Sequence, residues 1–197
     1  TYHAASRQEI AQIYQQSVER MNQLRDRLAA AGMPALRVSV GDTPGCSVVE
    51  KFGEVDEIRP GNFVFYDAMQ MQLGACREED IALAVACPVV AIHPERQQLV
   101  IYGGAVHLSK DYLEMPTGEN FGLVAPLQDS GWGRAVPETF VTSLSQEHGV
   151  IQTNAAFLQR IRAGDLLAVI PIHSCLTANL LKQYMTLDGE IFPMGIF

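Results

Sequence analysis

The sequence predicts an α/β segment followed by a mostly antiparallel β domain. One amphipathic pattern covers residues 6–31 and a short apolar run follows at residues 36–40, the succession of one helix-and-strand repeat. From Val55 onward, short apolar runs alternate with turns, which is typical of antiparallel sheets. Two further runs on either side of Asp188-Gly189 indicate a hairpin near the end of the chain.

The first predicted element is a helix over residues 6–31. Ser6 has the side chain of an N-cap, and Glu9 three residues later completes a capping box. Gly32 and Pro34 end the helix. Seven apolar residues recur at helical spacing and predict one stripe that packs on a core: Ile10, Ile13, Tyr14, Val18, Met21, Leu24 and Leu28.

A turn at residues 41–45 (Gly-Asp-Thr-Pro-Gly) follows the predicted strand at residues 36–40. Backbone N–H groups at a glycine turn and a threonine hydroxyl suit a phosphate at the C-terminal end of an α/β strand. An ordinary turn is the commoner meaning of this pattern when it is taken by itself.

The remaining apolar runs predict the strands of the β domain. They lie at residues 63–66, 81–92 with an interruption at Pro88, 98–102, 150–151, 166–172, 184–187 and 190–192. Residues 111–137 predict a loop-rich stretch.

Charge and cysteine usage limit the partners and the compartment. The 197-residue chain has a net charge of −8 and a pI near 5.0, which argues against nucleic acid or an anionic membrane as a partner. No apolar run approaches the length of a membrane span, and no signal peptide is visible. The four cysteines form no CxxC pair, so we expect a cytoplasmic location. Because the chain starts at Thr1, already close to a helix, we expect a piece of a longer protein.

A histidine and a cysteine follow the apolar run at residues 166–172. In an extended or loop backbone, His173 and Cys175 point the same way, so both side chains can face one ion. Imidazole nitrogen and thiolate sulfur are ligands that zinc prefers, with water or substrate at open positions of a catalytic site. A buried cysteine beside a half-buried histidine is the alternative interpretation.

The other histidines and the lysines carry weaker signals. His148 lies between Glu147 and Gly149 and is a weak catalytic candidate, whereas His107 fits a surface or core position equally well. The three lysines are Lys51, Lys110 and Lys182, and none ends a strand in a setting that would desolvate it for Schiff-base chemistry.

Four stretches in order resemble the C-terminal half of the D-serine dehydratase and D-threonine aldolase family, of the alanine racemase fold type. They lie at residues 39–44 (Ser-Val-Gly-Asp-Thr-Pro), 59–67 (Arg-Pro-Gly-Asn-Phe-Val-Phe-Tyr-Asp), 147–149 (Glu-His-Gly) and 171–177 (Pro-Ile-His-Ser-Cys-Leu-Thr). The resemblance implies that residues 1–54 are the C-terminal part of a (β/α)8 barrel that binds pyridoxal 5'-phosphate (PLP). It implies that residues 55–197 are a C-terminal β domain with a metal site, usually facing the cofactor across a homodimer.

Site residues follow from the same resemblance. Tyr2, Gly41, Asp42 and Thr43 would lie at the cofactor, although the acidic Asp42 departs from the family's usual serine. His173 and Cys175 match the metal ligands, and cysteine at the second position is similar to the zinc-dependent dehydratases, whereas aldolases tend to have aspartate there.

The expected function is therefore that of a PLP- and zinc-dependent lyase that dehydrates D-serine or a related D-β-hydroxy amino acid. The lysine that carries the cofactor is missing from this chain, so we expect the isolated fragment to be inactive. A D-threonine-type aldolase or an amino-acid racemase of the same fold is the alternative within the class. From another class, the chain could be a non-catalytic dimerisation domain with a structural metal.

Overall fold

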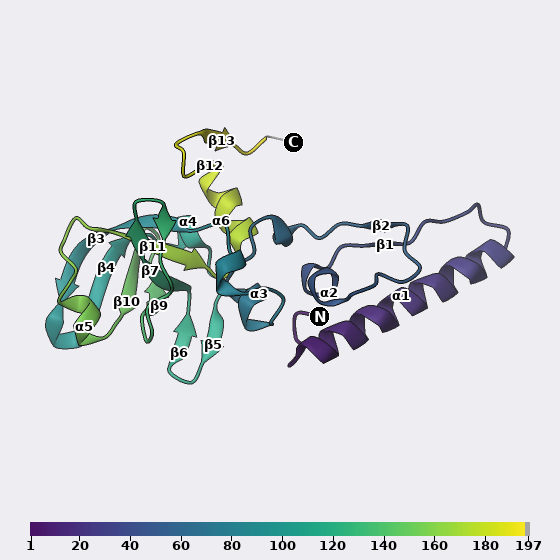
Figure 1. Cartoon of the computed structure of the whole chain (residues 1–197), viewed down its shortest axis with the longest axis horizontal. Helices are drawn as coiled ribbons and strands as arrows, with labels where there is room; N and C mark the ends of the chain where they lie inside the picture. Colours follow the sequence, from purple (N-terminus) through teal and green to yellow (C-terminus); the bar gives the residue numbers. More distant parts are fainter. Residues whose placement is uncertain (196–197) are drawn as a thin grey trace. The chain divides into compact units, whose positions relative to one another are not determined.

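A computed structural model describes residues 1–195 and divides the chain into two compact units, whose elements Figure 1 labels. Unit 1 comprises residues 1–66 and 70–81, and unit 2 comprises residues 67–69 and the chain from residue 82 onward. The division expected after residue 54 falls inside unit 1. The reason is that β2 (Glu57–Ile58) pairs in parallel with β1 (Ser39–Val40) of the same unit.

Helix α1 (Arg7–Ala30) confirms the first predicted element. The hydroxyl of Ser6 accepts a hydrogen bond from the Glu9 N–H at 3.2 Å, and the Glu9 carboxylate accepts one from the Ala5 N–H at 2.7 Å. Only the N-terminal half of the predicted stripe is fully buried, at Ile10, Tyr14 and Val18. Leu24 is 56% exposed, so the stripe extends beyond the surface that unit 1 covers.

Short elements make up the rest of unit 1. They are β1, β2, α2 (Thr43–Val48), η1 (Asn62–Val64), η2 (Glu78–Asp80) and the end of α3 (Ala68–Gln72). The strand predicted over residues 36–40 is reduced to two residues. The strand predicted over residues 63–66 is wrong: Phe65 and Tyr66 donate their N–H groups to the carbonyl of Asn62. Phe63 and Val64 are more than half exposed, so this apolar run reflects no buried strand.

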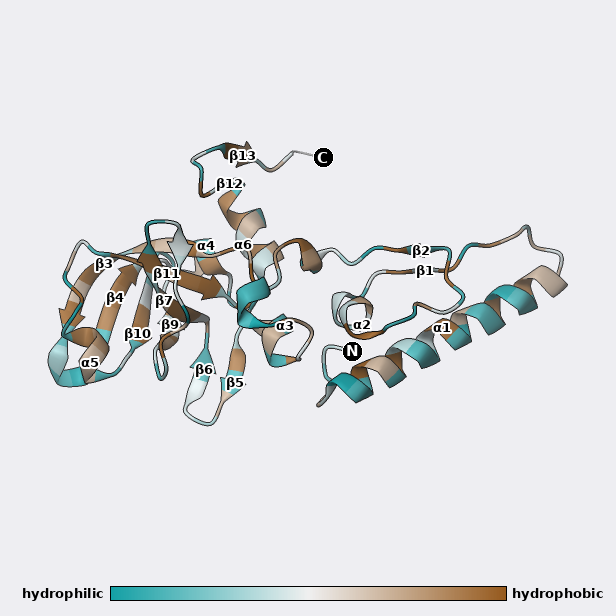
Figure 2. Ribbon diagram, viewed as in Figure 1, coloured by the Kyte–Doolittle hydropathy of each residue, from teal (hydrophilic) through white to brown (hydrophobic). Residues whose placement is uncertain are grey.

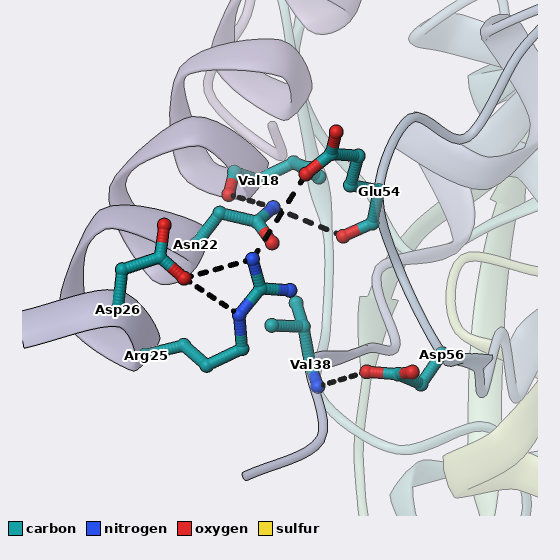
Figure 3. Close-up of polar contacts among 7 residues, drawn as sticks. All are labelled: Val18, Asn22, Arg25, Asp26, Val38, Glu54 and Asp56. Carbon is teal, nitrogen blue, oxygen red and sulfur yellow. Dashed lines mark hydrogen bonds and ion pairs between the residues drawn. The ribbon is translucent and has the colours of Figure 1, made fainter. Parts of the chain in front are cut away.

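Polar contacts join Glu54 to α1 and Asp56 to Val38, the residue before β1 (Figure 3). The Asn22 side-chain amide donates to the carbonyl of Glu54 at 2.9 Å, and Arg25 lies 3.9 Å from the Glu54 carboxylate. The Asp56 carboxylate accepts from the Val38 N–H at 2.7 Å. These polar contacts add to the packing of the buried Ile10, Tyr14 and Val18 on the rest of unit 1.

Six antiparallel strands of the described chain close into a barrel in unit 2, because β11 pairs with β3 on one side and with β7 on the other. In spatial order they are β11 (Leu166–Pro171), β3 (Val85–His93), β4 (Gln98–Tyr102), β10 (His148–Gln152), β9 (Phe140–Leu144) and β7 (Gly122–Gln128). The runs predicted at residues 98–102, 150–151 and 166–172 are thus confirmed as strands, and the run at residues 81–92 is confirmed from Val85 onward. Pro88 does not end β3, whose pairing with β4 shifts register between Val89 and Ala91.

The core of the protein lies inside this barrel. Its members come from every barrel strand and from neighbouring helices, and Leu99, Val124, Val141, Ile151 and Val169 are completely buried. Figure 2 shows the apolar colour along β3, β4 and β11 and alternating bands along α1. The barrel strands are therefore stabilised by one continuous apolar interior.

The remaining elements of unit 2 surround the barrel. They are the start of α3, η3 (Pro94–Arg96), α4 (Ala105–Leu108), β5 (Leu113–Met115), β6 (Gly118–Asn120), β8 (Gly131–Trp132), α5 (Ala155–Leu158), α6 (Ser174–Leu181), β12 (Gln183–Met185) and β13 (Ile191–Pro193). The antiparallel pairing of β12 with β13 confirms the predicted hairpin. None of the helices in the described chain combines the length and apolar character that crossing a membrane requires.

The loop-rich prediction for residues 111–137 is wrong, because this stretch contains β5, β6, β7 and β8. Glycine and proline within the stretch conceal the strand pattern. Gly122 begins β7, and a Cβ atom there would lie 2.6 Å from a methyl group of Val169 on the paired strand. Glycine at this position therefore allows close packing between the paired strands and does not indicate a loop.

Candidate metal site

The junction of β11 and α6 places His173 and Cys175. Strand β11 is buried over residues 167–171, and Ile172 is also completely buried, so the chain leaves the barrel with a fixed direction. His173 is the extended N-cap residue of α6, with φ −134° and ψ 94°, and Cys175 lies in the first turn of the helix. The sequence argument assumed an extended or loop backbone for both residues, and for Cys175 that assumption is wrong.

The two side chains nevertheless lie close together: the imidazole of His173 and the side chain of Cys175 form a hydrogen bond. This bond is the main cause that raises the pKa of His173 to about 9; burial acts in the opposite direction, and the carboxylates of Asp111 and Asp67 add to the increase. Imidazole and thiol thus face one another at the surface of unit 2, where His173 is 35% exposed.

Asp111 contacts the same imidazole at Nδ1. The Nδ1 atom of His173 lies 2.8 Å from an Asp111 carboxylate oxygen, and both side chains are partly buried. Asp111 follows α4, which is fastened to α6 by a hydrogen bond from the Thr177 hydroxyl to the Leu108 carbonyl at 3.4 Å. Sequence reasoning missed Asp111, since 62 residues separate it from His173 and no spacing signal joins them.

A second carboxylate fixes the backbone of the same turn. Asp67 is only 1% exposed and accepts a hydrogen bond at 3.0 Å from the N–H of Ser174, the first residue of α6. His173 makes no side-chain cap bond, so Asp67 caps the helix from a distant part of the sequence. The Met69 N–H donates to the Ile172 carbonyl, which explains why residues 67–69 belong to unit 2.

The donor set suits a soft or borderline metal ion. Imidazole nitrogen and thiolate sulfur are typical zinc ligands, and here a hydrogen bond joins the side chains of His173 and Cys175. Among residues 1–195, no group of three or more His, Cys, Asp or Glu side chains is arranged to hold a metal ion. His173 and Cys175 therefore offer two protein ligands, and the other coordination positions are left to water or a bound molecule.

The predicted phosphate turn in unit 1 is the start of a short helix. Asp42 caps α2: one carboxylate oxygen accepts from the Gly45 N–H at 2.8 Å, and the other accepts from the Thr1 hydroxyl at 2.6 Å. A Cβ atom on Gly45 would lie 2.1 Å from that carboxylate, so this close cap requires glycine. The negative charge of Asp42 is thus committed to neighbouring donors.

The other predicted cofactor residues are also in unit 1. Thr43 is 2% exposed; its hydroxyl oxygen accepts from the Asn62 N–H at 3.2 Å and keeps its own hydrogen to donate. Gly41 directly follows β1. The Tyr2 hydroxyl lies 3.3 Å from the Gln70 side-chain amide, and Tyr2 is 45% exposed. A threonine hydroxyl with a free hydrogen beside a glycine suits a phosphate group.

His148 is placed at the exposed start of β10. Its ring packs edge-on against Tyr102 with centroids 5.7 Å apart, and His107 packs on the same tyrosine at 5.1 Å. The two histidines come together because Gly104 lies against the backbone of residues 146–148, where a Cβ atom would come within 2.5 Å. This ring cluster gives His148 a packing role in unit 2.

Comparisons with known proteins agree with this architecture. A family model described as a putative serine dehydratase domain matches residues 82–187. D-serine dehydratase of Dictyostelium discoideum is 34% identical over 177 residues, which are 83% of this chain and 42% of that protein. D-threo-3-hydroxyaspartate dehydratase of Delftia sp. is 31% identical over 178 residues, 86% of this chain and 46% of that protein. The chain thus spans less than half the length of these two relatives.

Solved structures share the fold. The Delftia dehydratase superposes with a TM-score of 0.85 at 27% identity, covering 98% of this chain and 52% of that one. An alanine-racemase-like protein from Idiomarina loihiensis gives a TM-score of 0.86 at 27% identity, covering 100% and 54%. Two variants of the Delftia enzyme replace a histidine and, two positions later, a cysteine by alanine, and the structure of the cysteine variant is of a metal-free form.

Proposed function

This chain belongs to the putative serine dehydratase domain family, and on that premise we propose that it is part of a dehydratase, a lyase that acts on a D-amino acid. D-serine or a related D-β-hydroxy amino acid is the proposed substrate. PLP and zinc are the proposed cofactors. The observation that carries the proposal is the convergence of the His173 imidazole and the Cys175 side chain at the start of α6.

His173 and Cys175 are the proposed zinc ligands. They have the spacing of the histidine and the cysteine that were replaced in the Delftia dehydratase, whose cysteine variant is in a metal-free form. Zinc bound there would supply a Lewis acid that assists the departure of the substrate's β-hydroxyl group. The protein's own part is to hold imidazole and thiolate in one orientation on a buried strand end.

Gly41, Asp42, Thr43 and Tyr2 are the proposed cofactor residues. The hydroxyl of buried Thr43 has a hydrogen to donate to a phosphate oxygen. Asp42 would contribute only its backbone N–H, since its carboxylate is bound to Gly45 and Thr1 and holds the α2 turn in shape. PLP, when bound, supplies an electron sink for a carbanion at the substrate's α-carbon.

A lysine outside these 197 residues is proposed to carry the cofactor. Lys51, Lys110 and Lys182 are all exposed, so none has the buried setting that activates a lysine for Schiff-base chemistry. We accordingly expect the isolated chain to be inactive and to form no stable PLP adduct. Titration with PLP should therefore give no stable, saturable imine absorbance at one equivalent per chain, and such an absorbance, lost on substitution of one of the three lysines, would contradict this expectation. A homodimer and a cytoplasmic location remain predictions from the sequence.

The reaction itself is tested on the proposed longer polypeptide, which would supply the cofactor lysine. With PLP and zinc present, D-serine should yield pyruvate and ammonia. Cleavage of D-threonine to glycine and acetaldehyde, without dehydration of D-serine, would assign an aldolase instead, and interconversion of enantiomers would assign a racemase.

A structural metal is the alternative from another class. It is tested by replacing His173 with alanine in the 197-residue chain. Loss of zinc with the circular dichroism spectrum and unfolding midpoint retained supports a catalytic metal. Unfolding of the variant supports a structural metal in a non-catalytic domain.

A further inference from the structure

We propose that Asp111 is the positioning residue of the metal site: its carboxylate sets the orientation and the tautomer of His173, so that the Nε2 lone pair is presented to the metal. This inference rests on the proposed function, since it assumes that His173 binds a metal. It adds a residue that acts on a ligand and touches neither metal nor substrate.

The hydrogen-bond geometry determines the tautomer. An ionised carboxylate has no hydrogen to give, so at a separation of 2.8 Å the His173 Nδ1 atom must be the donor and Asp111 the acceptor. With its hydrogen on Nδ1, a neutral imidazole has its lone pair on Nε2, at the opposite edge of the ring. The Cys175 side chain is hydrogen-bonded to the same ring. Since Nδ1 is bonded to Asp111, we assign Nε2 and the Cys175 sulfur as the two donor atoms for one ion.

The position of Asp111 is itself fixed by the fold. Its backbone N–H donates to the Ser109 hydroxyl at 3.2 Å. Ser109, the C-cap residue that follows α4, has φ +68° and ψ −176°, a conformation that residues with side chains rarely adopt. The bond from Thr177 on α6 to Leu108 on α4 ties this turn to the helix that carries Cys175. Cys175 on α6 and Asp111 after α4 are therefore held by two elements that a hydrogen bond connects.

The two carboxylates near the site have separate tasks. Asp67 is buried and bonds to the backbone N–H of Ser174, so it holds the helix end. Asp111 is 39% exposed and bonds to the imidazole, so its removal should leave the helix end intact. Carboxylates that accept a hydrogen bond from a metal-ligating histidine typically contribute about 10–100-fold to metal affinity. We expect Asp111 to contribute within this range.

The test is the zinc affinity of the 197-residue chain, measured by competition with a chromophoric chelator at fixed pH. Asp111→Ala should weaken zinc binding about 10–100-fold, with Asp111→Asn in between, because the amide oxygen accepts the same bond without the charge. Asp129→Asn is the matched control, since it removes one negative charge from an exposed residue after β7. The register of β7 and β11 places Asp129 and His173 beyond opposite ends of this strand pair.

A second measurement separates positioning from general stability. Nitrogen-15 NMR of the histidine rings in the zinc-bound chain should show hydrogen on Nδ1 of His173 in wild type and in Asp129→Asn. In Asp111→Ala at saturating zinc, the hydrogen on Nδ1 should exchange faster with water, while the unfolding midpoint of the metal-free chain stays within a few degrees of wild type.

The outcomes distinguish the inference from the function on which it rests. If Asp111→Ala binds zinc as tightly as wild type while His173→Ala loses it, Asp111 has no positioning role and the metal site stands. If the wild-type chain binds no zinc, both are overturned. A fall in affinity that Asp129→Asn reproduces would also contradict the inference, because the effect would then be one of net charge.

Discussion

The two units of the molecule use different means to hold their shape. Unit 2 closes six strands around an interior in which Leu99, Ile151 and Val169 are completely buried. Within the described chain, the strands of unit 1 are only β1 and β2, a parallel pair of two residues each beside a long helix. Parallel pairs normally belong to larger sheets covered on both faces. Unit 2 therefore has the structure of a self-sufficient domain, whereas unit 1 combines a short apolar face of α1 with polar contacts such as those of Figure 3.

This difference bears on the site. The proposed metal ligands follow a strand of the stable barrel, and the proposed cofactor residues lie in the less stabilised unit. A metal pair needs a fixed separation between two donor atoms, and a closed barrel can supply it without help. We infer that the metal site is formed by unit 2 alone.

The largest expected difference between the two units is in the rate of amide hydrogen exchange, measured on the whole chain. Amides in the central barrel strands β4 and β10 should exchange roughly 100-fold or more slowly than those in the C-terminal half of α1, because the former open only with global unfolding. Equal protection in both regions would break the comparison.

The second largest contrast is in how the two units respond when an apolar side chain is truncated. Leu99→Ala removes a completely buried side chain from the barrel and should lower the free energy of unfolding of unit 2 by about 2–5 kcal/mol. Leu24→Ala, at a position 56% exposed on α1, should change it by less than about 0.5 kcal/mol. Urea unfolding followed by circular dichroism measures both, and a large effect of Leu24→Ala would contradict the assignment of the core.

The sequence predicts much of this architecture where a local pattern coincides with burial. The capped start of α1, strand β4 and the β12–β13 hairpin follow directly from caps, apolar runs and turn residues. The strand prediction for residues 63–66 is wrong because Phe63 and Val64 are exposed. A run of apolar residues in the sequence does not show whether other parts of the chain bury them. Strand β7 is hidden because Gly122 allows close packing that has no local signature.

The candidate site is predicted only in part for a similar reason. His173 and Cys175 are two positions apart, so the sequence can single them out as a pair, although the backbone that brings them together differs from the extended one assumed. Asp67 and Asp111 reach the same turn from 107 and 62 residues away. Only the closure of the barrel and the packing of α4 on α6 bring these carboxylates there, and neither leaves a pattern in a single sequence.

Removing the Asp67 carboxylate should have a smaller effect than truncating the core. Asp67→Ala deletes the acceptor for the first N–H of α6 and should cost about 1–2 kcal/mol. Asp26→Ala is the control: this carboxylate is 68% exposed and pairs with Arg25 on α1, an interaction of at most about 1 kcal/mol. If both variants have the same stability in urea, Asp67 does not cap α6.

The smallest expected effect is a pH dependence of the metal-free chain. The pKa of His173 is raised from 6.5 to about 9, so protonated His173 stabilises the folded state fully below pH 6.5, and this contribution disappears as the pH rises through about 9. Because the side chain is 35% exposed, the effect should stay below about 1 kcal/mol. The difference in unfolding free energy between wild type and His173→Gln, measured across that range, should shrink with rising pH. A difference that grows instead would contradict the contacts of His173.

Zinc binding to the 197-residue chain tests the central claim most directly. Wild type should bind about one zinc ion per chain, and His173→Ala and Cys175→Ala should each lose it while the barrel unfolds at the same urea concentration. Full zinc occupancy in both variants would contradict the account, because the ion would then be held elsewhere.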